Sequence, residues 1–458
     1  MNHKRDLTFW QMWNLSFGFF GVQTAYALQN NSNSRIFATL GADPHSLSYF
    51  WILPPLMGLL VQPIIGAMSD RTWNRFGRRI PYLLFGAIIA VVVMCFFPNA
   101  GSLGLKTVAA SLALGALCLM LLDTSLNIGM QPFKMMVGDL VNERQKAKAY
   151  SIQSFLCNAG SLVGYVFPFA LAFFGVSNQA EAGVVPDTVI YSFYICAALL
   201  IGCVVYTVTK VKEMPPKEYA EFHGIDLEKT SGKKESSNMF KLLLKAPKTF
   251  WTVGLVQFFC WSAFLYMWNY SNGAIAANCW GVDTNASGYA ATAEYQAAGN
   301  WVGIVFAVQA VGSILWALVI PRFRNLKTAY VVSLLIGAVG FASVMFVHDP
   351  YVLFVSYFLI GAAWAAMLAL PFTLLTNALE GSSRMGTYLG LFNGTICIPQ
   401  IAAALLGGTV LSLVGDSQPA MFAVAGGLLL LGAEALRMAA AGQDNARLQT
   451  LDRLAVLH

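Results

Sequence analysis

Charged residues are scarce in this sequence. Asp, Glu, Lys and Arg make up 11% of its 458 residues, whereas about 25% is usual for soluble globular domains. Apolar residues make up 57%, too many to be hidden inside one soluble core. The long apolar runs therefore predict a membrane protein whose helices face lipid.

Motifs built from cysteine or histidine are also lacking. The eight cysteines include no CxxC pair, so their spacing indicates neither a zinc site nor a redox motif. The longest loop expected outside the membrane, residues 277–298, contains Asp283 and Glu294 but no histidine. A membrane-embedded enzyme, such as a lipid-linked glycosyltransferase, usually carries acidic or histidine clusters there. We therefore expect no enzyme, no metal, no cofactor and no nucleic-acid partner.

Twelve apolar runs have the length of about 20 residues that crosses a bilayer as a helix. Because the number of spans is even, both chain ends are expected on the same side of the membrane. The twelve runs lie near residues 8–30, 46–68, 80–98, 107–138, 147–174, 188–209, 248–276, 299–320, 328–347, 351–378, 385–414 and 419–440.

The basic residues predict the orientation of these spans. With a cytoplasmic N-terminus, 26 of the 28 Lys and Arg lie on the cytoplasmic side, and only Arg35 and Lys106 do not. The net charge of +6 thus reflects the positive-inside rule and does not indicate nucleic acid. We expect a multi-pass protein of the cell (inner) membrane with both termini in the cytoplasm.

The longest hydrophilic stretch, residues 210–247, divides the spans into six and six. We predict an N-terminal six-helix bundle at 1–209, a cytoplasmic linker at 210–247, a C-terminal six-helix bundle at 248–440 and a cytoplasmic tail at 441–458. This all-α layout resembles the major facilitator superfamily, whose two bundles surround a central cavity.

The loop "GAMSDRTWNRFGRR", residues 66–79, follows a pattern of that superfamily. The positive-inside rule explains its arginines but not its aspartate, nor glycines where the turn must be tight. We predict a cytoplasmic latch, and the resemblance places its partner in the eleventh span near Met385. The second half has a copy, "IPRFRNLKTAY" at 320–330, without the aspartate. The predicted gating residues of the first loop are Gly66, Asp70, Arg71, Gly77, Arg78 and Arg79.

Other runs resemble a narrower family. The segment at 51–87, the frame D-x-x-x-N-x-x-x-x-P-x-K-x-x-x-x-D-L from Asp123, and "GLFNGTICIPQ" at 390–400 are similar to proton-coupled sucrose transporters. These belong with the glycoside–pentoside–hexuronide cation symporters. The resemblance implies sugar symport by alternating access, with Asp123 as the proton carrier. The chain departs from the plant sucrose branch at 261–273, which lacks acidic residues.

Asp123 lies at the centre of the fourth span and is the one carboxylate we place deep within any span. An isolated charge at that depth costs at least about 2.5–3.5 kcal/mol. The alternative to a proton carrier is a structural aspartate, hydrogen-bonded inside the bundle. Asn127 at i+4 and Lys134 at i+11 fall on the same helix face. We assign Lys134 and Asp139 to gating, because Lys134 can pair with Asp139 or extend its ammonium towards the cytoplasm.

A neutral sugar is best recognised by amides, which both donate and accept hydrogen bonds, and by flat aromatic rings. Each such residue could instead form a hydrogen bond between helices. No arginine lies at the centre of a span, which argues against an anionic substrate. The predicted sugar contacts are Gln23, Tyr26, Asn30, Asn127, Asn158, Gln257, Trp261, Trp268, Asn377, Asn393 and Gln400.

These features predict a monomeric, proton-coupled importer of a neutral sugar, with a disaccharide such as sucrose or maltose as substrate. One alternative is a drug/proton antiporter of the same superfamily, whose pocket would be more apolar. The other is a sodium-coupled glycoside symporter, whose cation site uses acids in the second span. Residues 46–68 contain no acid.

Overall fold

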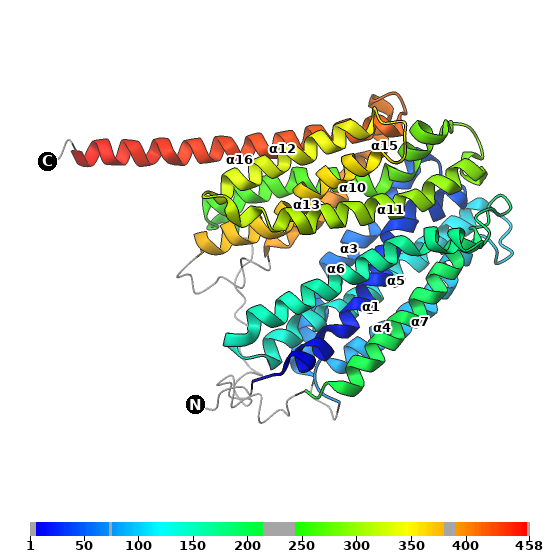
Figure 1. The fold of residues 1–458 in the computed structure, drawn as a ribbon, viewed down its shortest axis with the longest axis horizontal. Coiled ribbons are helices and arrows are strands. Elements are labelled where there is room, and N and C mark those ends of the chain that lie inside the picture. The colour runs from blue at the N-terminus through cyan, green and yellow to red at the C-terminus, as the bar shows by residue number, and fades with distance from the viewer. Residues whose placement is uncertain (1–5, 73–75, 214–242, 380–387, 389–390, 456–458) are drawn as a thin grey trace. The chain divides into compact units, whose positions relative to one another are not determined.

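The computed structural model describes residues 6–72, 76–213, 243–379, 388 and 391–455. All regular structure within these ranges is helical (Figure 1). The long helices are α1 (Phe9–Thr39), α3 (Leu53–Arg71), α4 (Ile80–Phe96), α5 (Val108–Leu140), α6 (Glu143–Phe173), α7 (Asp187–Lys210), α10 (Lys248–Trp280), α11 (Ala293–Ala317), α12 (Leu326–Val344), α13 (Leu353–Ala378), α15 (Gly394–Leu413) and α16 (Gln418–Ala455).

These twelve long helices correspond to the twelve predicted runs, so the all-helical membrane fold is confirmed. Over the described residues, eleven segments are long and apolar enough to cross a membrane. The helix missing from those eleven is α1, whose last third reads "QNNSNSRIFAT". Its mean hydropathy is lowered by polar side chains that are nevertheless buried.

Polar residues define where several helices begin. Thr8 and Gln11 form a reciprocal capping box at the start of α1, in which each side chain accepts from the other residue's backbone N–H. Thr107 accepts from Ala110 at the start of α5, and Asn142 accepts from Gln145 at the start of α6. These side chains satisfy backbone donors that lack a partner in the first turn.

Three helices differ in length from the predicted spans. The second span consists of a short α2 (Pro44–Phe50), a turn and α3, because Pro54 and Pro55 cannot donate the backbone hydrogen bonds of a continuous helix. α1 continues to Thr39 instead of ending near residue 30. α16 has 38 residues and includes most of the predicted C-terminal tail.

The chain divides into two compact units. The first contains residues 1–237 and 285–307, and the second contains 238–284 and 308–458. Residues 285–307, which we predicted to lie in the C-terminal bundle, group with the first unit, and the predicted domain bounds stay a prediction. In the first unit α1 packs against α5, α6 and α7, and in the second α10 packs against α13, α15 and α16.

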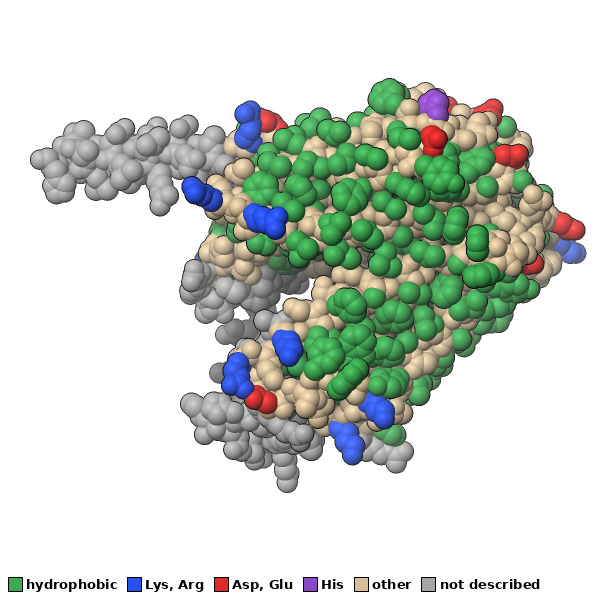
Figure 2. All heavy atoms as spheres, in the orientation of Figure 1, with side chains coloured by type: hydrophobic (Ala, Val, Ile, Leu, Met, Phe, Trp, Pro, Cys, Tyr) green, Lys and Arg blue, Asp and Glu red, His purple; other side chains and the backbone are tan. Residues whose placement is uncertain are grey.

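Large apolar side chains on the outer faces of the helices are exposed. Figure 2 shows hydrophobic side chains spread over the visible helical surface, with Lys, Arg, Asp and Glu confined to a few places. Phe85 and Val92 on α4 are 57% and 52% exposed, and Val339 on α12 is 62% exposed. Such surfaces are suited to contact with lipid acyl chains.

Candidate transport site

Asp123 lies inside the first unit with no exposed surface. Its Oδ2 accepts a hydrogen bond of 2.8 Å from Nε2 of Gln29, which is equally buried on α1. Asp123 Oδ1 and Gln29 Oε1 have no hydrogen-bond partner among the described residues. The pair therefore holds two buried acceptor atoms that lack a donor, an arrangement that is costly unless one is supplied.

A chain of amides continues from Asp123 along α5. Asn127 Nδ2 donates to the backbone carbonyl of Asp123 at 2.8 Å. Its Oδ1 accepts from Nε2 of Gln62 on α3 at 2.7 Å. The bonds from Gln29 to Asp123 and from Gln62 to Asn127 thus join α1, α5 and α3 through one polar core.

The remaining predicted contacts of the first unit lie on α1 and α6. Gln23 Nε2 donates to Sγ of Cys157 at 2.9 Å, which ties α1 to α6. Asn158 Nδ2 donates to its own helix at the carbonyl of Ser154, 2.8 Å away. Tyr26 is half-buried and Asn30 is buried. The described hydrogen bonds of Gln23 and Asn158 go to α6 and not to Asp123.

Aromatic rings gather in the second unit. Trp261 and Trp268 of α10 both lie edge-on to Trp364 of α13, with ring centroids 5.7 and 5.8 Å away. Phe264 completes the group at 5.0 Å from Trp364. Trp261 Nε1 is buried without a partner among the described residues. The aromatic cluster, defined as Trp261, Phe264, Trp268 and Trp364, offers flat faces and an unused donor.

The predicted sugar-binding amides of the second unit differ in burial and in hydrogen-bond partners. Gln257 is fully buried, accepts from Tyr330 of α12 at 3.3 Å and faces the Met367 carbonyl at 3.5 Å, which suits a bond between helices. Gln400 donates to the Ile396 carbonyl of its own helix at 3.0 Å. Asn393 precedes α15 without capping it through its side chain, and Asn377 is exposed near the end of α13.

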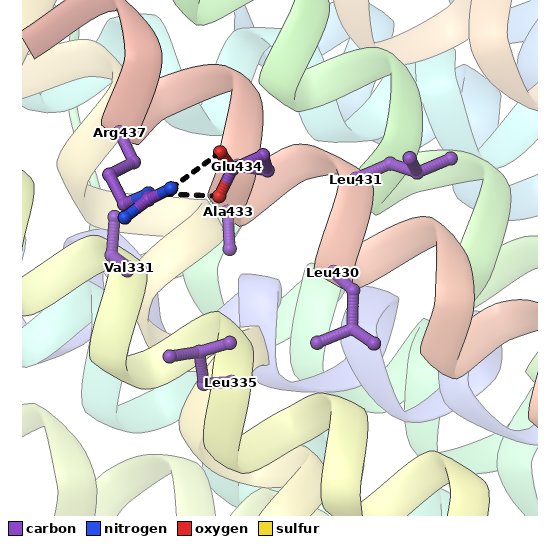
Figure 3. A pocket seen from close by; sticks show the side chains of 7 residues that line it. All are labelled: Val331, Leu335, Leu430, Leu431, Ala433, Glu434 and Arg437. Carbon is purple, nitrogen blue, oxygen red and sulfur yellow. Dashed lines mark hydrogen bonds and ion pairs between the residues drawn. The ribbon is translucent and has the colours of Figure 1, made fainter.

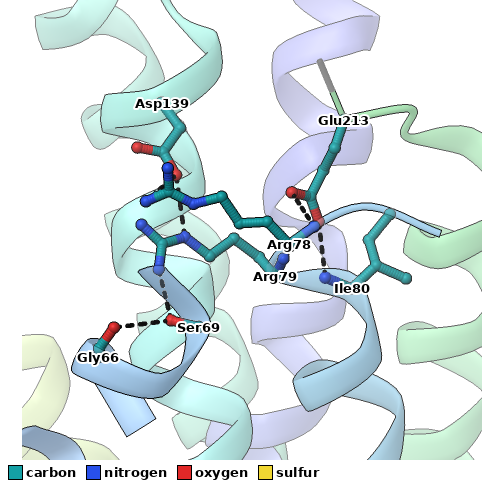
Figure 4. Close-up of polar contacts among 7 residues, drawn as sticks. All are labelled: Gly66, Ser69, Arg78, Arg79, Ile80, Asp139 and Glu213. Atoms are coloured by element: carbon teal, nitrogen blue, oxygen red, sulfur yellow. Dashed lines mark hydrogen bonds and ion pairs between the residues drawn. The ribbon is translucent and has the colours of Figure 1, made fainter. Parts of the chain in front are cut away.

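Charged groups converge where α3 meets α4 (Figure 4). Arg79 Nε donates to Asp139 on α5 at 2.9 Å, and its guanidinium also bonds to Ser69, whose hydroxyl donates to the Gly66 carbonyl. Arg78 lies 4.0 Å from the same carboxylate. Two predicted gating arginines therefore bind the predicted gating aspartate.

A second carboxylate caps the start of α4. Glu213, just after α7, accepts backbone N–H bonds from Arg78, Arg79 and Ile80 at 2.8, 2.7 and 2.7 Å. Gly77 has φ +105°, and a Cβ there would lie 2.7 Å from Glu213 Cδ. Gly77 thus provides both the left-handed turn and the space for this cap.

Several predicted gating groups fall outside the described part of the structure. The side chains of Asp70, Arg71 and Lys134 are among them, as is Met385 in the eleventh span. The proposed pairing of Asp70 with the eleventh span and that of Lys134 with Asp139 stay predictions.

Comparison with known proteins identifies the family of this chain. The family model for MFS/sugar transport protein matches residues 36–416. The chain belongs to this family. Its members are transporters, and this chain is accordingly a multi-pass transporter and not an enzyme.

Two similar proteins are named for the sugars that they transport. This chain is 24% identical to sucrose transport protein SUC4 of Arabidopsis thaliana, over 88% of its length and 84% of the relative. It is 26% identical to the general alpha-glucoside permease of Schizosaccharomyces pombe, over 43% of this chain and 34% of the permease. The solved nucleoside transporter NupG shares the fold at a TM-score of 0.64 and 16% identity, covering 94% of this chain and 98% of that one.

The second unit of this family member also has a hollow of about 470 Å³ between α12 and α16 (Figure 3). Its walls are mainly aliphatic, and its polar groups are Glu434 and Arg437, which pair with each other at 2.9 Å. None of the predicted sugar contacts lines it. An aliphatic wall suits an acyl chain better than a sugar, so we do not assign the substrate to this hollow. Its lining residues are Val331, Leu335, Leu430, Leu431, Ala433, Glu434 and Arg437.

Four residues of these sites were not predicted from the sequence. They are Gln29 and Gln62 near Asp123, Glu213 at the start of α4, and Trp364 in the aromatic cluster. Gln29 begins the polar run "QNNSNSR", which interrupts an apolar span and was the available signal. Glu213 was assigned to the linker, and only the return of the chain after α7 places it on α4. Trp364 stands alone in its apolar run, so neighbouring residues do not identify its aromatic partners.

Proposed function

We propose that this transporter imports a neutral glycoside together with protons, with a disaccharide such as sucrose or maltose as substrate. The observation that carries the proposal is the fully buried Asp123, bonded to Gln29 and continued by Asn127 and Gln62. The sucrose and alpha-glucoside relatives support a sugar as the cargo.

Protonation of Asp123 would supply what the buried pair lacks. A neutral acid has one O–H donor, whereas an ionised carboxylate only accepts. A carboxyl group removed from water also favours its neutral form. In this proposal Asp123 takes up a proton when open to the outside and releases it to water when open to the cytoplasm. A potential of 100 mV supplies about 2.3 kcal/mol for each proton, or roughly fifty-fold accumulation.

For sugar recognition we propose the amides beside Asp123 within the first unit and, as a separate proposal for the second unit, the aromatic cluster. Amide groups match hydroxyls because each donates and accepts. Trp261 and Trp364 can cover the C–H faces of a sugar ring, and the unused Trp261 Nε1 can donate to a hydroxyl. Asn127 stands beside Asp123, so a bound sugar and the proton would share one polar core.

The wider setting also belongs to the proposal. We infer a monomer in the cell (inner) membrane. We place both termini in the cytoplasm, as the distribution of Lys and Arg predicts. The coupling ion is H⁺, and no other cofactor is required. The group formed by Arg78, Arg79, Asp139 and Glu213 would then lie on the cytoplasmic side and serve the inner gate.

The test is uptake of a panel of radiolabelled sugars by vesicles containing the purified protein, with and without a pH gradient. Asp123→Asn should abolish gradient-driven accumulation, because an amide cannot carry the proton, while sugar exchange without a gradient persists. Asp187→Asn is the matched control, since Asp187 is exposed at the start of α7, and it should accumulate sugar normally.

Three outcomes would contradict the proposal. If Asp123→Asn still concentrates sugar under a pH gradient, the proton-carrier role is wrong. If only a sodium gradient drives uptake, the transporter is a sodium symporter. If a lipophilic cation is transported and no sugar competes, the antiporter alternative replaces this function.

A further inference from the structure

Arg35, near the end of α1, is a buried cation that the proposed transport chemistry does not use. Its residue surface is 2% exposed. Its guanidinium donates to three side-chain amide oxygens, Gln296 Oε1 at 2.6 Å, Asn300 Oδ1 at 2.8 Å and Asn178 Oδ1 at 2.8 Å. No carboxylate pairs with it in the described part of the chain. Burying a charge is costly, so these three neutral acceptors, one for each guanidinium nitrogen, form an organised site.

Two of the acceptors are themselves held in place. Gln296 Nε2 donates to the Thr39 hydroxyl at 3.0 Å and to the Ala290 carbonyl at 2.6 Å, which directs its oxygen to Arg35. The Thr188 hydroxyl donates to Asn178 Oδ1 at 2.7 Å. The site thus joins α1, α11, the residues before α7 and the start of α7.

Glycines let α11 come close to this site. A Cβ at Gly299 would lie 2.6 Å from Arg35 Cδ and 2.7 Å from Nε, so the arginine side chain lies over that glycine. One turn further, a Cβ at Gly303 would lie 3.0 Å from Nδ2 of Asn31 and would overlap the Tyr165 carbonyl. Gly299 and Gly303 have the spacing that permits close helix packing in membranes. A larger side chain at Gly303 would push α11 away from the backbone of α6, and one at Gly299 would displace the Arg35 side chain.

α11 is also the helix that passes from one unit to the other. Its residues up to Ala307 pack in the first unit, and those from Val308 onward belong to the second. Two of the three bonds of Arg35, those to Gln296 and Asn300, therefore hold the first half of α11, whose second half belongs to the other unit.

We propose that Arg35 with Gln296, Asn300 and Asn178 forms a latch that closes the outer side of the transporter and releases when it opens outward. This inference rests on the proposed alternating-access function and on Arg35 lying outside the cytoplasm. The neutral acceptors suit a contact that must break in every cycle. When the latch opens, water solvates the arginine and the amides, and no buried carboxylate is left without its partner.

Spin labels test the latch without sugar or a proton gradient. Leu103→Cys in the first unit and Val352→Cys in the second are about half exposed, and both lie in loops expected on the outer side. The exposed Cys95 is replaced by serine in this background. Pulsed electron paramagnetic resonance of the full chain in lipid nanodiscs then measures the distribution of label-to-label distances. Arg35→Gln should raise the ratio of long to short distances by about tenfold, since it removes charge-assisted hydrogen bonds.

Matched variants complete the experiment. Lys106→Gln removes the other positive charge expected outside the cytoplasm, from an exposed position, and should leave the distribution unchanged. Asn300→Ala removes one of the three bonds and should shift the distances in the same direction by a smaller factor, which keeps the test informative if Arg35→Gln fails to fold. An unchanged distribution in Asn300→Ala and in folded Arg35→Gln, or an equal shift in Lys106→Gln, overturns the latch. Because neither sugar nor protons enter the measurement, that result is distinct from a failure of Asp123→Asn.

Discussion

The two units of this transporter differ in what they bury. The first encloses ionisable groups, with Asp123 on Gln29, Arg35 on three amides and Arg79 on Asp139. The second encloses rings and neutral amides, with the aromatic cluster beside Gln257 and Tyr330. Under the proposed function, this difference corresponds to a division of labour in which the first unit responds to protons and the second mainly shapes a surface that a sugar contacts.

The same difference is repeated in two equivalent loops. The helix after the first loop, α4, is capped by the carboxylate of Glu213 through three backbone N–H bonds. The helix after the second loop, α12, is capped by the neutral side chain of Asn325, which accepts from Lys327 N at 2.9 Å. In the described part of the chain, the start of α12 is thus capped by a neutral amide, whereas the start of α4 is capped by a carboxylate.

Removing the Glu213 cap should have the largest effect of three changes that test this comparison. Glu213→Ala leaves three backbone donors without their charged acceptor, and we expect a loss of about 2–3 kcal/mol in the free energy of unfolding. Thermal unfolding of the purified protein in detergent measures the loss. Glu213→Gln keeps one acceptor oxygen and should fall between Ala and wild type. If Glu213→Ala and the wild type unfold at the same temperature, the Glu213 cap does not stabilise the first unit.

An intermediate effect is expected in the aromatic cluster. Trp364→Ala removes the ring that Trp261, Phe264 and Trp268 all contact, and sugar affinity should fall by about 1 kcal/mol, or roughly fivefold. Competition against a radiolabelled sugar measures the affinity. Trp251→Ala on the same α10 is the control, because Trp251 is 53% exposed and outside the cluster. Equal losses in both variants would show a general effect on folding and no role in binding.

The smallest effect should come from the neutral cap. Asn325→Ala removes one backbone acceptor at the start of α12, and such N-cap substitutions cost about 1 kcal/mol. The same thermal unfolding assay compares it directly with Glu213→Ala. A loss as large as that of Glu213→Ala would make the two loops equivalent and remove the distinction between charged and neutral caps.

The helices could be predicted well from the sequence because the bilayer dictates their length and apolarity. The break after α2 was missed, although Pro54 and Pro55 signal it. The deep position of Asp123 could be predicted from its place in an apolar run, but its hydrogen bond to Gln29 could not. A helical wheel assumes one polar face, whereas α1 near its end is buried on every side, including Gln29, Asn30, Asn31 and Asn33.

The site was less predictable where distant segments meet. Glu213 reaches α4 across more than a hundred residues, and Arg35 reaches Gln296 and Asn300 across more than two hundred. Local spacing carries no information about such pairs. The motif at 66–79 did predict a tight turn with glycine, and Gly77 has the left-handed φ of +105° that such a turn requires.

The polar end of α1 has a consequence for how the protein is made. α1 is synthesised before the helices that bury its polar end, yet it is absent from the eleven described helices that are long and apolar enough to cross a membrane. Residues Asn30, Asn31, Asn33 and Arg35 find buried surroundings only after α5, α6, α7 and the start of α11 have been synthesised. We therefore expect these later helices to assist the insertion of α1, so that α1 reaches its final depth only after they have been inserted.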